Sequence, residues 1–309
     1  MKNFAITGVA GYIAPRHLEA IKDTGNRLVA AVDPHDSVGI LDSYFPDTSF
    51  FTEFERFDRH LEMLRRANKG NQVHYISICS PNHLHDAHIR LALRIGADAI
   101  CEKPLVLNPW NLDRLQELEE DFNAKIFTVL QLRLHPTLLK IKQELDGKIV
   151  KTKHTVKLRY ITTRGKWYRY SWKGDSERSG GIVTNIGIHF FDLLIWLFGN
   201  VQENIVYLRK EEKAAGYLEL EKANVDWFLS IDRNDLHDVG ETNGRRTNRS
   251  ITIDGKELEF SSGFTNLHTR IYDGILSGYG FGIEDARTSI ELVYNIRNIE
   301  LVANKLYSE

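Results

Sequence analysis

The stretch ITGVAGYIAPRH, residues 6–17, joins a short apolar run to the first helical pattern of the chain. Its small residues follow the spacing G-x-x-G-x-x-A, which departs by one place from the dinucleotide fingerprint G-x-G-x-x-G/A. Such loops bind phosphates because their backbone N–H groups can approach the ligand and a helix N-terminus adds partial positive charge. The candidate cofactor contacts here are Gly8, Ala10, Gly11, Tyr12 and Ile13. A tight strand–helix turn without a ligand is the alternative interpretation.

An acidic residue ends the next apolar run, LVAAVD at residues 28–33. Asp33 lies about 20 residues beyond the glycine loop, where a carboxylate typically holds the ribose hydroxyls of adenosine. A carboxylate at this position repels a 2′-phosphate, so the two signals together predict NAD, and not NADP, as the cofactor. The alternative for Asp33 is an ordinary turn residue before Pro34.

Length and composition limit the class of protein. The chain has 309 residues, 42% of them hydrophobic and 27% charged, with a formal net charge of -2. This balance is typical of a soluble globular protein and predicts neither nucleic-acid nor membrane binding. Cys79 and Cys101 lie in apolar runs, so we expect both to be buried and reduced, as in the cytoplasm. The N-terminal apolar run is short and interrupted by glycines, which argues against a secretion signal.

Short apolar runs alternate with helical patterns in the first part of the chain. The runs are residues 4–7, 28–33, 73–79, 97–101 and 125–130, and the helical patterns include residues 15–22, 55–66 and 83–96. This alternation predicts an α/β fold with a Rossmann-type parallel sheet, covered by helices on both faces, over residues 1–130.

The second part of the chain has a different pattern. Alternating runs at residues 151–162, 215–231 and 249–260 predict strands, and Asp254-Gly255 in the last run predicts a hairpin. Helices are expected only at about 181–198 and 285–306. The prediction is therefore an α+β domain with an open, mostly antiparallel sheet over residues 131–309.

Several segments occur in an order that resembles one protein family. They are the glycine loop, Asp33, SPNHLH at 80–85, EKP at 102–104 and GGIVTNIGIHFFD at 180–192. Together they resemble the glucose–fructose oxidoreductase/inositol dehydrogenase (Gfo/Idh/MocA) family over the whole chain. The resemblance implies an NAD-dependent sugar dehydrogenase whose second domain binds substrate and forms homo-oligomers, often tetramers.

Within that family, residues 164–192 are most similar to the UDP-N-acetylglucosaminuronate 3-dehydrogenases of bacterial O-antigen (lipopolysaccharide) biosynthesis. This similarity implies NAD-dependent oxidation of the 3-hydroxyl of a UDP-linked uronate, a nucleotide sugar. In some relatives the bound NADH is reoxidised by 2-oxoglutarate, which is therefore a candidate partner. Two alternatives stay open: a same-family dehydrogenase of a free polyol or hexose such as inositol, and a non-enzymatic NAD-binding regulator.

Lys103 and His189 are the candidate catalytic pair. Lys103 follows an apolar run, where a charge is costly unless a site needs it, and His189 shares a helical face with Asn185. Oxidation of a secondary alcohol needs a base for the hydroxyl proton, and an ammonium group beside the oxygen stabilises the developing negative charge. Many family members have aspartate in place of Asn185, so which residue takes the proton is open. The alternatives are a surface lysine and a core histidine.

The resemblance places a further set of residues beside the nicotinamide: Ser80, Pro81, Asn82, His85, Glu102, Lys103 and Gln131. The histidines of NHLHDAH lack the additional ligands that a metal site needs, so no metal is expected. The resemblance also implies that a loop with His268 and Tyr272 helps to close the active site, and the alternative is a flexible connection.

Residues 157–178 hold seven lysines and arginines, two acids and five aromatic residues. Three interpretations are open: stacking on single-stranded nucleic acid, a nucleotide-sugar pocket in which cations meet a diphosphate and a uronate, and a solvated strand and loop. The near-neutral charge of the chain argues against the first. The candidate substrate contacts are Arg164, Tyr168 and Lys173, together with Lys103, Asn185 and His189.

Overall fold

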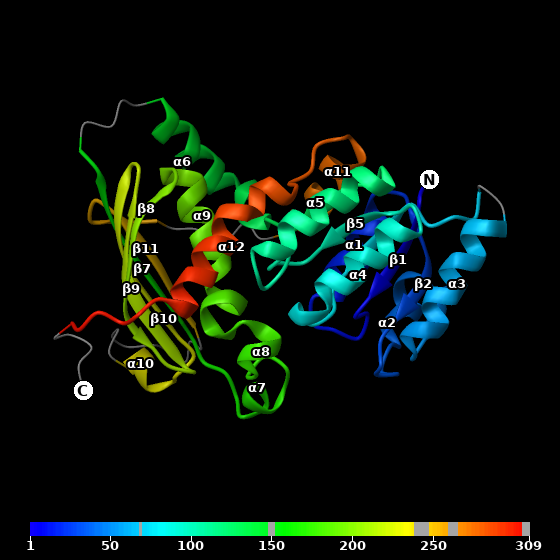
Figure 1. Ribbon diagram of the computed structural model, residues 1–309, viewed down its shortest axis with the longest axis horizontal. Helices are drawn as coiled ribbons and strands as arrows, with labels where there is room; N and C mark the ends of the chain where they lie inside the picture. The colour runs from blue at the N-terminus through cyan, green and yellow to red at the C-terminus, as the bar shows by residue number, and fades with distance from the viewer. Residues whose placement is uncertain (68–69, 148–151, 238–246, 259–264, 305–309) are drawn as a thin grey trace. The chain divides into compact units, whose positions relative to one another are not determined.

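The structure, a computed structural model, describes residues 1–67, 70–147, 152–237, 247–258 and 265–304. The chain divides into two compact units (Figure 1). Unit 1 is Met1–Gln131 with Asn266–Arg287, and unit 2 is Leu132–Thr265 with Thr288–Glu309. The segment Asn266–Arg287, which the sequence analysis placed with the second domain, therefore packs in unit 1.

Unit 1 is built on a six-stranded sheet with the strand order β3-β2-β1-β4-β5-β6. The strands are β1 (Asn3–Thr7), β2 (Arg27–Val32), β3 (Ser49–Phe51), β4 (Tyr75–Ile78), β5 (Asp98–Cys101) and β6 (Ile126–Thr128). Each pairing in this sheet is parallel. Strand β1 is buried along its whole length, as expected for a parallel sheet with both faces covered. The predicted Rossmann-type fold is confirmed.

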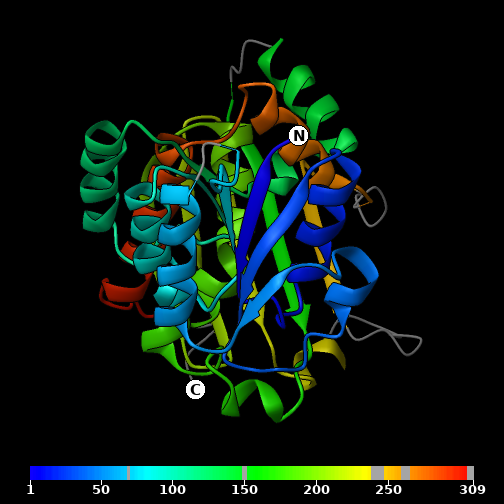
Figure 2. The ribbon, with the colours of Figure 1, turned by 90° about the vertical axis from the view of Figure 1, so that its right-hand side faces the viewer.

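Helices lie on both sides of this sheet, with α1 (Ala14–Asp23) on one side and α4 (His85–Arg94) on the other (Figure 2). Helix α4 packs against α5 (Trp110–Phe122), and α1 packs against α11 (Leu267–Leu276). The remaining helical elements are α2 (Ile40–Tyr44), α3 (Phe54–Ala67) and the 3-10 helices Asn82–Leu84 and Gln131–Leu134. The expectation of a loop or flexible connection around His268 and Tyr272 is wrong, because both residues are buried in α11.

Unit 2 contains a mixed sheet with the strand order β12-β11-β7-β10-β9-β8. The strands are β7 (His154–Thr162), β8 (Val201–Arg209), β9 (Lys213–Leu220), β10 (Ala223–Ser230), β11 (Thr247–Ile253) and β12 (Lys256–Glu257). Strands β7 and β10 pair in parallel, and the other pairings are antiparallel. The predicted mostly antiparallel sheet is confirmed.

Asp254 and Gly255 form the predicted hairpin turn between β11 and β12. Their φ angles are 51° and 79°, and Ile253 pairs with Lys256 across the turn. Two successive residues in the left-handed region are typical of a two-residue type I′ hairpin, which explains the Asp-Gly sequence. The ends of three predicted elements, at residues 151, 259–260 and 305–306, lie outside the described residues.

The helices of unit 2 are more numerous than the sequence predicted. They are α6 (Pro136–Asp146), α7 (Trp167–Tyr170), α8 (Ser176–Ser179), a π-helix at Val183–Gly187, α9 (Ile188–Phe198) and α10 (Asn234–His237), and α12 (Ile283–Asn298) begins in unit 1. Helix α9 lies along one face of the sheet (Figure 1), and the ring of Phe191 is 5.3 Å from that of Trp227. The segment Ser176–Phe198 is long and apolar enough for a membrane span by composition, but 72% of its apolar window is buried inside the protein, as in a core helix.

Candidate active site

The glycine loop begins directly after β1 and is built around Gly8. Its φ of +78° lies in the left-handed region, and its N–H donates to the carbonyl of Val32 at 2.8 Å. A Cβ at this position would lie 2.6 Å from the backbone of both Cys79 and Ser80. Only glycine therefore allows the loop after β1 to lie this close to the loop after β4. Helix α1 follows at once and directs its N-terminus toward this loop.

The buried carboxylate of Asp33 lies beside the same loop. Its Oδ2 accepts a hydrogen bond from the backbone N–H of Ala10 at 3.0 Å, and its Oδ1 accepts one from the N–H of His35 at 2.9 Å. Asp33, directly after β2, is thus hydrogen-bonded to the loop after β1. This contact goes beyond the alternative interpretation of Asp33 as an ordinary turn residue before Pro34. A close-approach glycine, a helix N-terminus and an acid in this arrangement fit the adenosine and phosphate parts of a dinucleotide.

The predicted cofactor residues of unit 1 share one edge of the parallel sheet. Since the strands run in the same direction, their carboxyl ends meet at this edge. The residues follow β1 (Gly8, Ala10, Gly11, Tyr12, Ile13), β2 (Asp33), β4 (Ser80, Pro81, Asn82, His85), β5 (Glu102, Lys103) and β6 (Gln131). The strand order reverses between β1 and β4, which is where ligands bind in open α/β sheets.

Two histidines of the NHLHDAH segment hold the loop after β4. Nδ1 of His88 lies 2.9 Å from the hydroxyl of Ser80 and 3.1 Å from that of Thr7. Burial, and then the neighbouring histidines, lower the pKa of His88 to about 3, so the ring is neutral at ordinary pH. Nε2 of His85 lies 2.9 Å from the carbonyl oxygen of Ser80. These ring nitrogens contact protein groups that shape the predicted cofactor loop.

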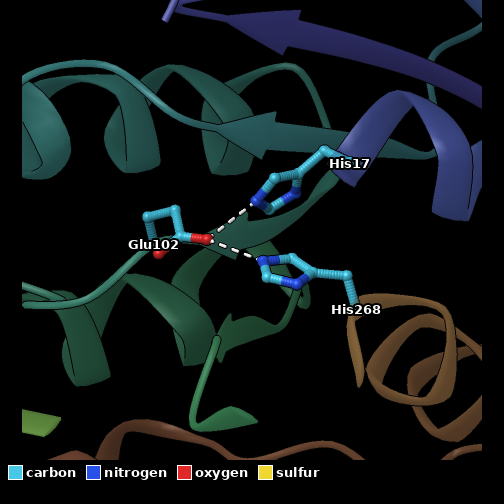
Figure 3. Close-up of side chains that lie close together, drawn as sticks. All are labelled: His17, Glu102 and His268. Atoms are coloured by element: carbon cyan, nitrogen blue, oxygen red, sulfur yellow. Dashed lines mark hydrogen bonds and ion pairs between the residues drawn. The ribbon is translucent and has the colours of Figure 1, made fainter. Parts of the chain in front are cut away.

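Glu102 forms a buried cluster that the sequence analysis missed (Figure 3). Its Oε1 lies 2.9 Å from Nε2 of His17 and 3.1 Å from Nε2 of His268. Burial alone would raise the pKa of Glu102, but the hydrogen bonds to the two histidines hold it well below its usual value. Burial lowers the pKa of His17, so the cluster contains an ionised carboxylate and a neutral His17 ring. Lys103 follows Glu102 directly and is half-exposed.

In unit 2, Asn185 and His189 are half-exposed, whereas the three residues between them are buried. Asn185 lies in the π-helix and His189 in the first turn of α9, and π-helical turns are frequent at functional sites. Nδ2 of Asn185 donates to the hydroxyl of Tyr168 at 3.0 Å. Burial raises the pKa of Tyr168, so its hydroxyl stays protonated. Both predicted helix residues are therefore partly accessible, and their orientation toward one substrate stays a prediction.

The predicted substrate residues Arg164, Tyr168 and Lys173 are neighbours in unit 2. Nζ of Lys173 lies 5.1 Å from the ring of Trp172 and 5.5 Å from that of Trp167. Burial, and then the charge of Arg164, lower the pKa of Lys173, and the charge of Arg164 also acts on Tyr168. Two cations and two indole rings thus gather within one short segment, which suits an anionic ligand with a flat ring.

Other charged residues of the 157–178 segment are held in ion pairs. Arg169 pairs with Glu212, and Arg178 pairs with Asp175.

Asp192 of α9 forms a buried two-pronged ion pair with Arg133, at 2.7 Å and 3.1 Å. Asp192 is therefore held by Arg133. Lys103 belongs to unit 1 and the pair Asn185 and His189 to unit 2, so their convergence on one substrate stays a prediction.

Comparison with known proteins identifies the domains of this chain. Residues 2–129 match the GFO/IDH/MocA oxidoreductase family, NAD-binding Rossmann fold, and residues 142–232 match the C-terminal alpha/beta domain of the same family. A crystal structure of the WlbA (WbpB) dehydrogenase from Thermus thermophilus in complex with NAD and alpha-ketoglutarate is 52% identical, with a TM-score of 0.94, and the match covers 99% of this chain and 97% of that one.

A second structure of the Thermus thermophilus dehydrogenase, in complex with NAD and UDP-GlcNAcA, is 51% identical with a TM-score of 0.93, over 99% of this chain and 98% of that one. Among curated proteins, the glucose-6-phosphate 3-dehydrogenase of Bacillus subtilis is 27% identical over 64% of this chain and 54% of its own length. The matches to the curated relatives thus span about half of their length or less.

Proposed function

Because the chain belongs to the Gfo/Idh/MocA oxidoreductase family and carries its NAD-binding Rossmann domain, we propose that it oxidises the 3-hydroxyl of UDP-N-acetylglucosaminuronate to the 3-keto sugar. The observation that carries this proposal is the identity of 51% to a dehydrogenase crystallised with NAD and UDP-GlcNAcA, over 99% of this chain. The product belongs to the precursors of bacterial surface polysaccharides such as O-antigen.

The reaction breaks the C3–H bond of the sugar and the O–H bond of its 3-hydroxyl. The C3–H bond gives a hydride to NAD, the cofactor that supplies the acceptor, while the O–H bond gives a proton to a base and a C3=O bond forms. His189 is a suitable base because it is half-exposed on the accessible face of α9. The Lys103 ammonium stabilises negative charge on the oxygen. Asn185 carries no charge, and its amide is held in place because Nδ2 donates to the hydroxyl of Tyr168. Its role is therefore to orient the substrate or the His189 ring.

The segment around Lys173 binds the nucleotide part of this substrate. Arg164 and Lys173 offer positive charge to a diphosphate or a uronate carboxylate, and Trp167, which is 55% exposed, offers a ring for stacking. This arrangement supports the nucleotide-sugar interpretation over a solvated loop, because Lys173 is half-buried and its Nζ lies over the rings of Trp167 and Trp172.

Under the same proposal, the enzyme acts in the cytoplasm and forms a homo-oligomer, a tetramer. 2-Oxoglutarate reoxidises bound NADH, a role supported by the Thermus thermophilus structure that contains NAD and alpha-ketoglutarate. Gel filtration with light scattering tests the oligomer.

The test of the activity is the absorbance of reduced nicotinamide after UDP-N-acetylglucosaminuronate and NAD are added to the purified protein. We expect a rise with this sugar and none with UDP-N-acetylglucosamine, which lacks the carboxylate. If the protein is purified with NADH, 2-oxoglutarate is added first and the fall of the same band is followed. If the protein turns over myo-inositol or a free hexose, and a UDP-linked sugar reacts no faster, the proposal is replaced by a dehydrogenase of a free polyol or hexose.

A further inference from the structure

We propose that three buried histidines, His17, His85 and His268, are positioning residues that hold the two neighbours of Lys103 in place. The inference rests on the catalytic role proposed for Lys103. Glu102 is held from α1 and α11, and Pro104 is held from α4. Each of the three histidines is at most 4% exposed, so none of them reaches a substrate itself.

On the Glu102 side, one carboxylate oxygen meets two imidazole rings (Figure 3). His17 comes from α1 and His268 from α11, which lie 85 and 166 residues from Glu102 in the chain. A buried carboxylate is tolerated only if hydrogen bonds or opposite charge compensate it, and here two ring N–H groups do so. The bonds fix the carboxylate in space and with it the backbone that leads into Lys103.

The protonation of His17 follows from its second nitrogen. Nδ1 of His17 lies 2.7 Å from the hydroxyl of Tyr272, which lies 2.6 Å from the hydroxyl of Ser77. The pKa of Tyr272 is raised well above its usual value, first by burial, so the phenol keeps its proton and donates a hydrogen bond to Nδ1. A neutral His17 that accepts at Nδ1 must donate from Nε2, and the Glu102 carboxylate accepts that hydrogen bond. The hydrogen-bond chain therefore has one direction, from Ser77 to Glu102.

On the Pro104 side, His85 bridges two loops. Its Nδ1 lies 2.7 Å from the carbonyl oxygen of Pro104, and its Nε2 lies 2.9 Å from the carbonyl oxygen of Ser80. His85 therefore contacts both the loop after β5 and the loop after β4, where the predicted cofactor contacts lie. Because burial lowers the pKa of His85, the neutral ring donates a hydrogen bond to one of these two carbonyl oxygens. The residues on both sides of Lys103 are buried and hydrogen-bonded, whereas Lys103 itself is half-exposed. A misplacement of about 1 Å at a reacting group can cost about 100-fold in rate, so this support matters for catalysis.

The cluster of His17, Glu102 and His268 also has the composition of a metal site. The tautomer of His17 favours the hydrogen-bonded arrangement. Because Tyr272 donates to Nδ1 of His17, the ring proton stays on Nε2, and a protonated Nε2 cannot ligate an ion. Metal analysis of the purified protein distinguishes the two, because a bound ion would be present in stoichiometric amount and would be lost when His17 is replaced.

The experiment compares His17→Leu and His268→Leu, which remove a donor to Glu102, with His17→Gln, which can restore an N–H donor. We expect the leucine variants to remain folded and to lose about 10-fold or more in kcat, with KM for the sugar changed much less. His17→Gln should recover much of the loss. The matched control is His74→Leu, because His74 accepts a hydrogen bond from the N–H of Asn3 at the opposite, amino end of the strands and should leave kcat unchanged.

A second readout is independent of the sugar. An amine-reactive reagent acylates Lys103 at a rate that can be followed by mass spectrometry. The dependence of this rate on pH reports the surroundings of the Lys103 ammonium group. We expect the midpoint of this profile to shift in both leucine variants and to stay in place in the His74 control. This measurement tests the positioning role even if UDP-N-acetylglucosaminuronate proves not to be the substrate. Folded leucine variants with an unchanged kcat and an unchanged Lys103 profile, or a metal ion lost with His17, would overturn the inference.

Discussion

Replacing Gly8 with alanine tests the close approach of the loops after β1 and β4, because two separate constraints act on this glycine. Its φ of +78° lies in the left-handed region, where a side chain costs about 1–2 kcal/mol. The added Cβ would also lie 2.6 Å from backbone atoms of Cys79 and Ser80, so the backbone must move. Overpacking of this kind costs about 1–3 kcal/mol. We therefore expect Gly8→Ala to lower the free energy of unfolding by about 2–5 kcal/mol.

The matched control is Gly25→Ala, since Gly25 has a φ of +70° and no atom within 4 Å of its added Cβ. It should lose only the conformational part, about 1–2 kcal/mol, and the difference between the variants isolates the steric part. Urea unfolding gives both values, and the quenching of protein fluorescence by NADH gives the cofactor affinity. Gly8→Ala should bind NADH about 10-fold or more weakly, which corresponds to about 1.4 kcal/mol. Equal stability and equal NADH affinity in the two variants would refute the close approach of the loops.

Three further outcomes are expected. Lys103→Ala should reduce kcat by about 100-fold or more at an unchanged thermal midpoint, and a variant with full activity would contradict the proposed mechanism. Arg133→Met removes the guanidinium that pairs with the buried Asp192 and should cost about 3–5 kcal/mol in urea unfolding, whereas Arg133→Met with Asp192→Leu should recover most of this loss. The pKa of His88, lowered to about 3 by burial, predicts that stability falls as pH drops from about 6.5 toward 3, by up to about 1.4 kcal/mol per pH unit. His88→Gln should flatten this slope relative to the wild type in unfolding titrations, and parallel curves would show that His88 does not titrate as described.

Much of the fold was predictable because its signals are local. The strand–helix alternation and the apolar runs indicate where parallel strands begin and end. The run at residues 4–7 lies within β1, and the run at residues 97–101 includes the whole of β5. Asp254-Gly255 specifies its hairpin because both residues adopt the left-handed conformation that this turn requires. The placement of the glycine loop, Asp33 and Lys103 at one sheet edge was also predictable, since the carboxyl ends of parallel strands meet there.

Helix α9 shows where local signals were incomplete. The spacing of Asn185 and His189 predicted a shared face, and both are half-exposed in the structure. The π-helical turn that carries Asn185 has no pattern of its own in the sequence, because it depends on how the turn packs: a Cβ on Gly187 would lie 2.7 Å from the side chain of Leu229 and 2.8 Å from that of Phe191. The ion pair of Arg133 with Asp192 was likewise hidden, since neither residue specifies its partner in the sequence.

The sequence by itself determined the fold class and the family, together with the elements that carry the cofactor loop and Lys103. These features depend on hydrophobic periodicity, turn chemistry and short motifs, which act between residues near one another in the chain. Only the tertiary structure decided that Glu102 is held by His17 and His268, and that the segment with His268 and Tyr272 is a buried helix of unit 1. The physical reason is that a buried carboxylate takes whichever donors the packed helices bring to it, and here those donors lie 85 and 166 residues away.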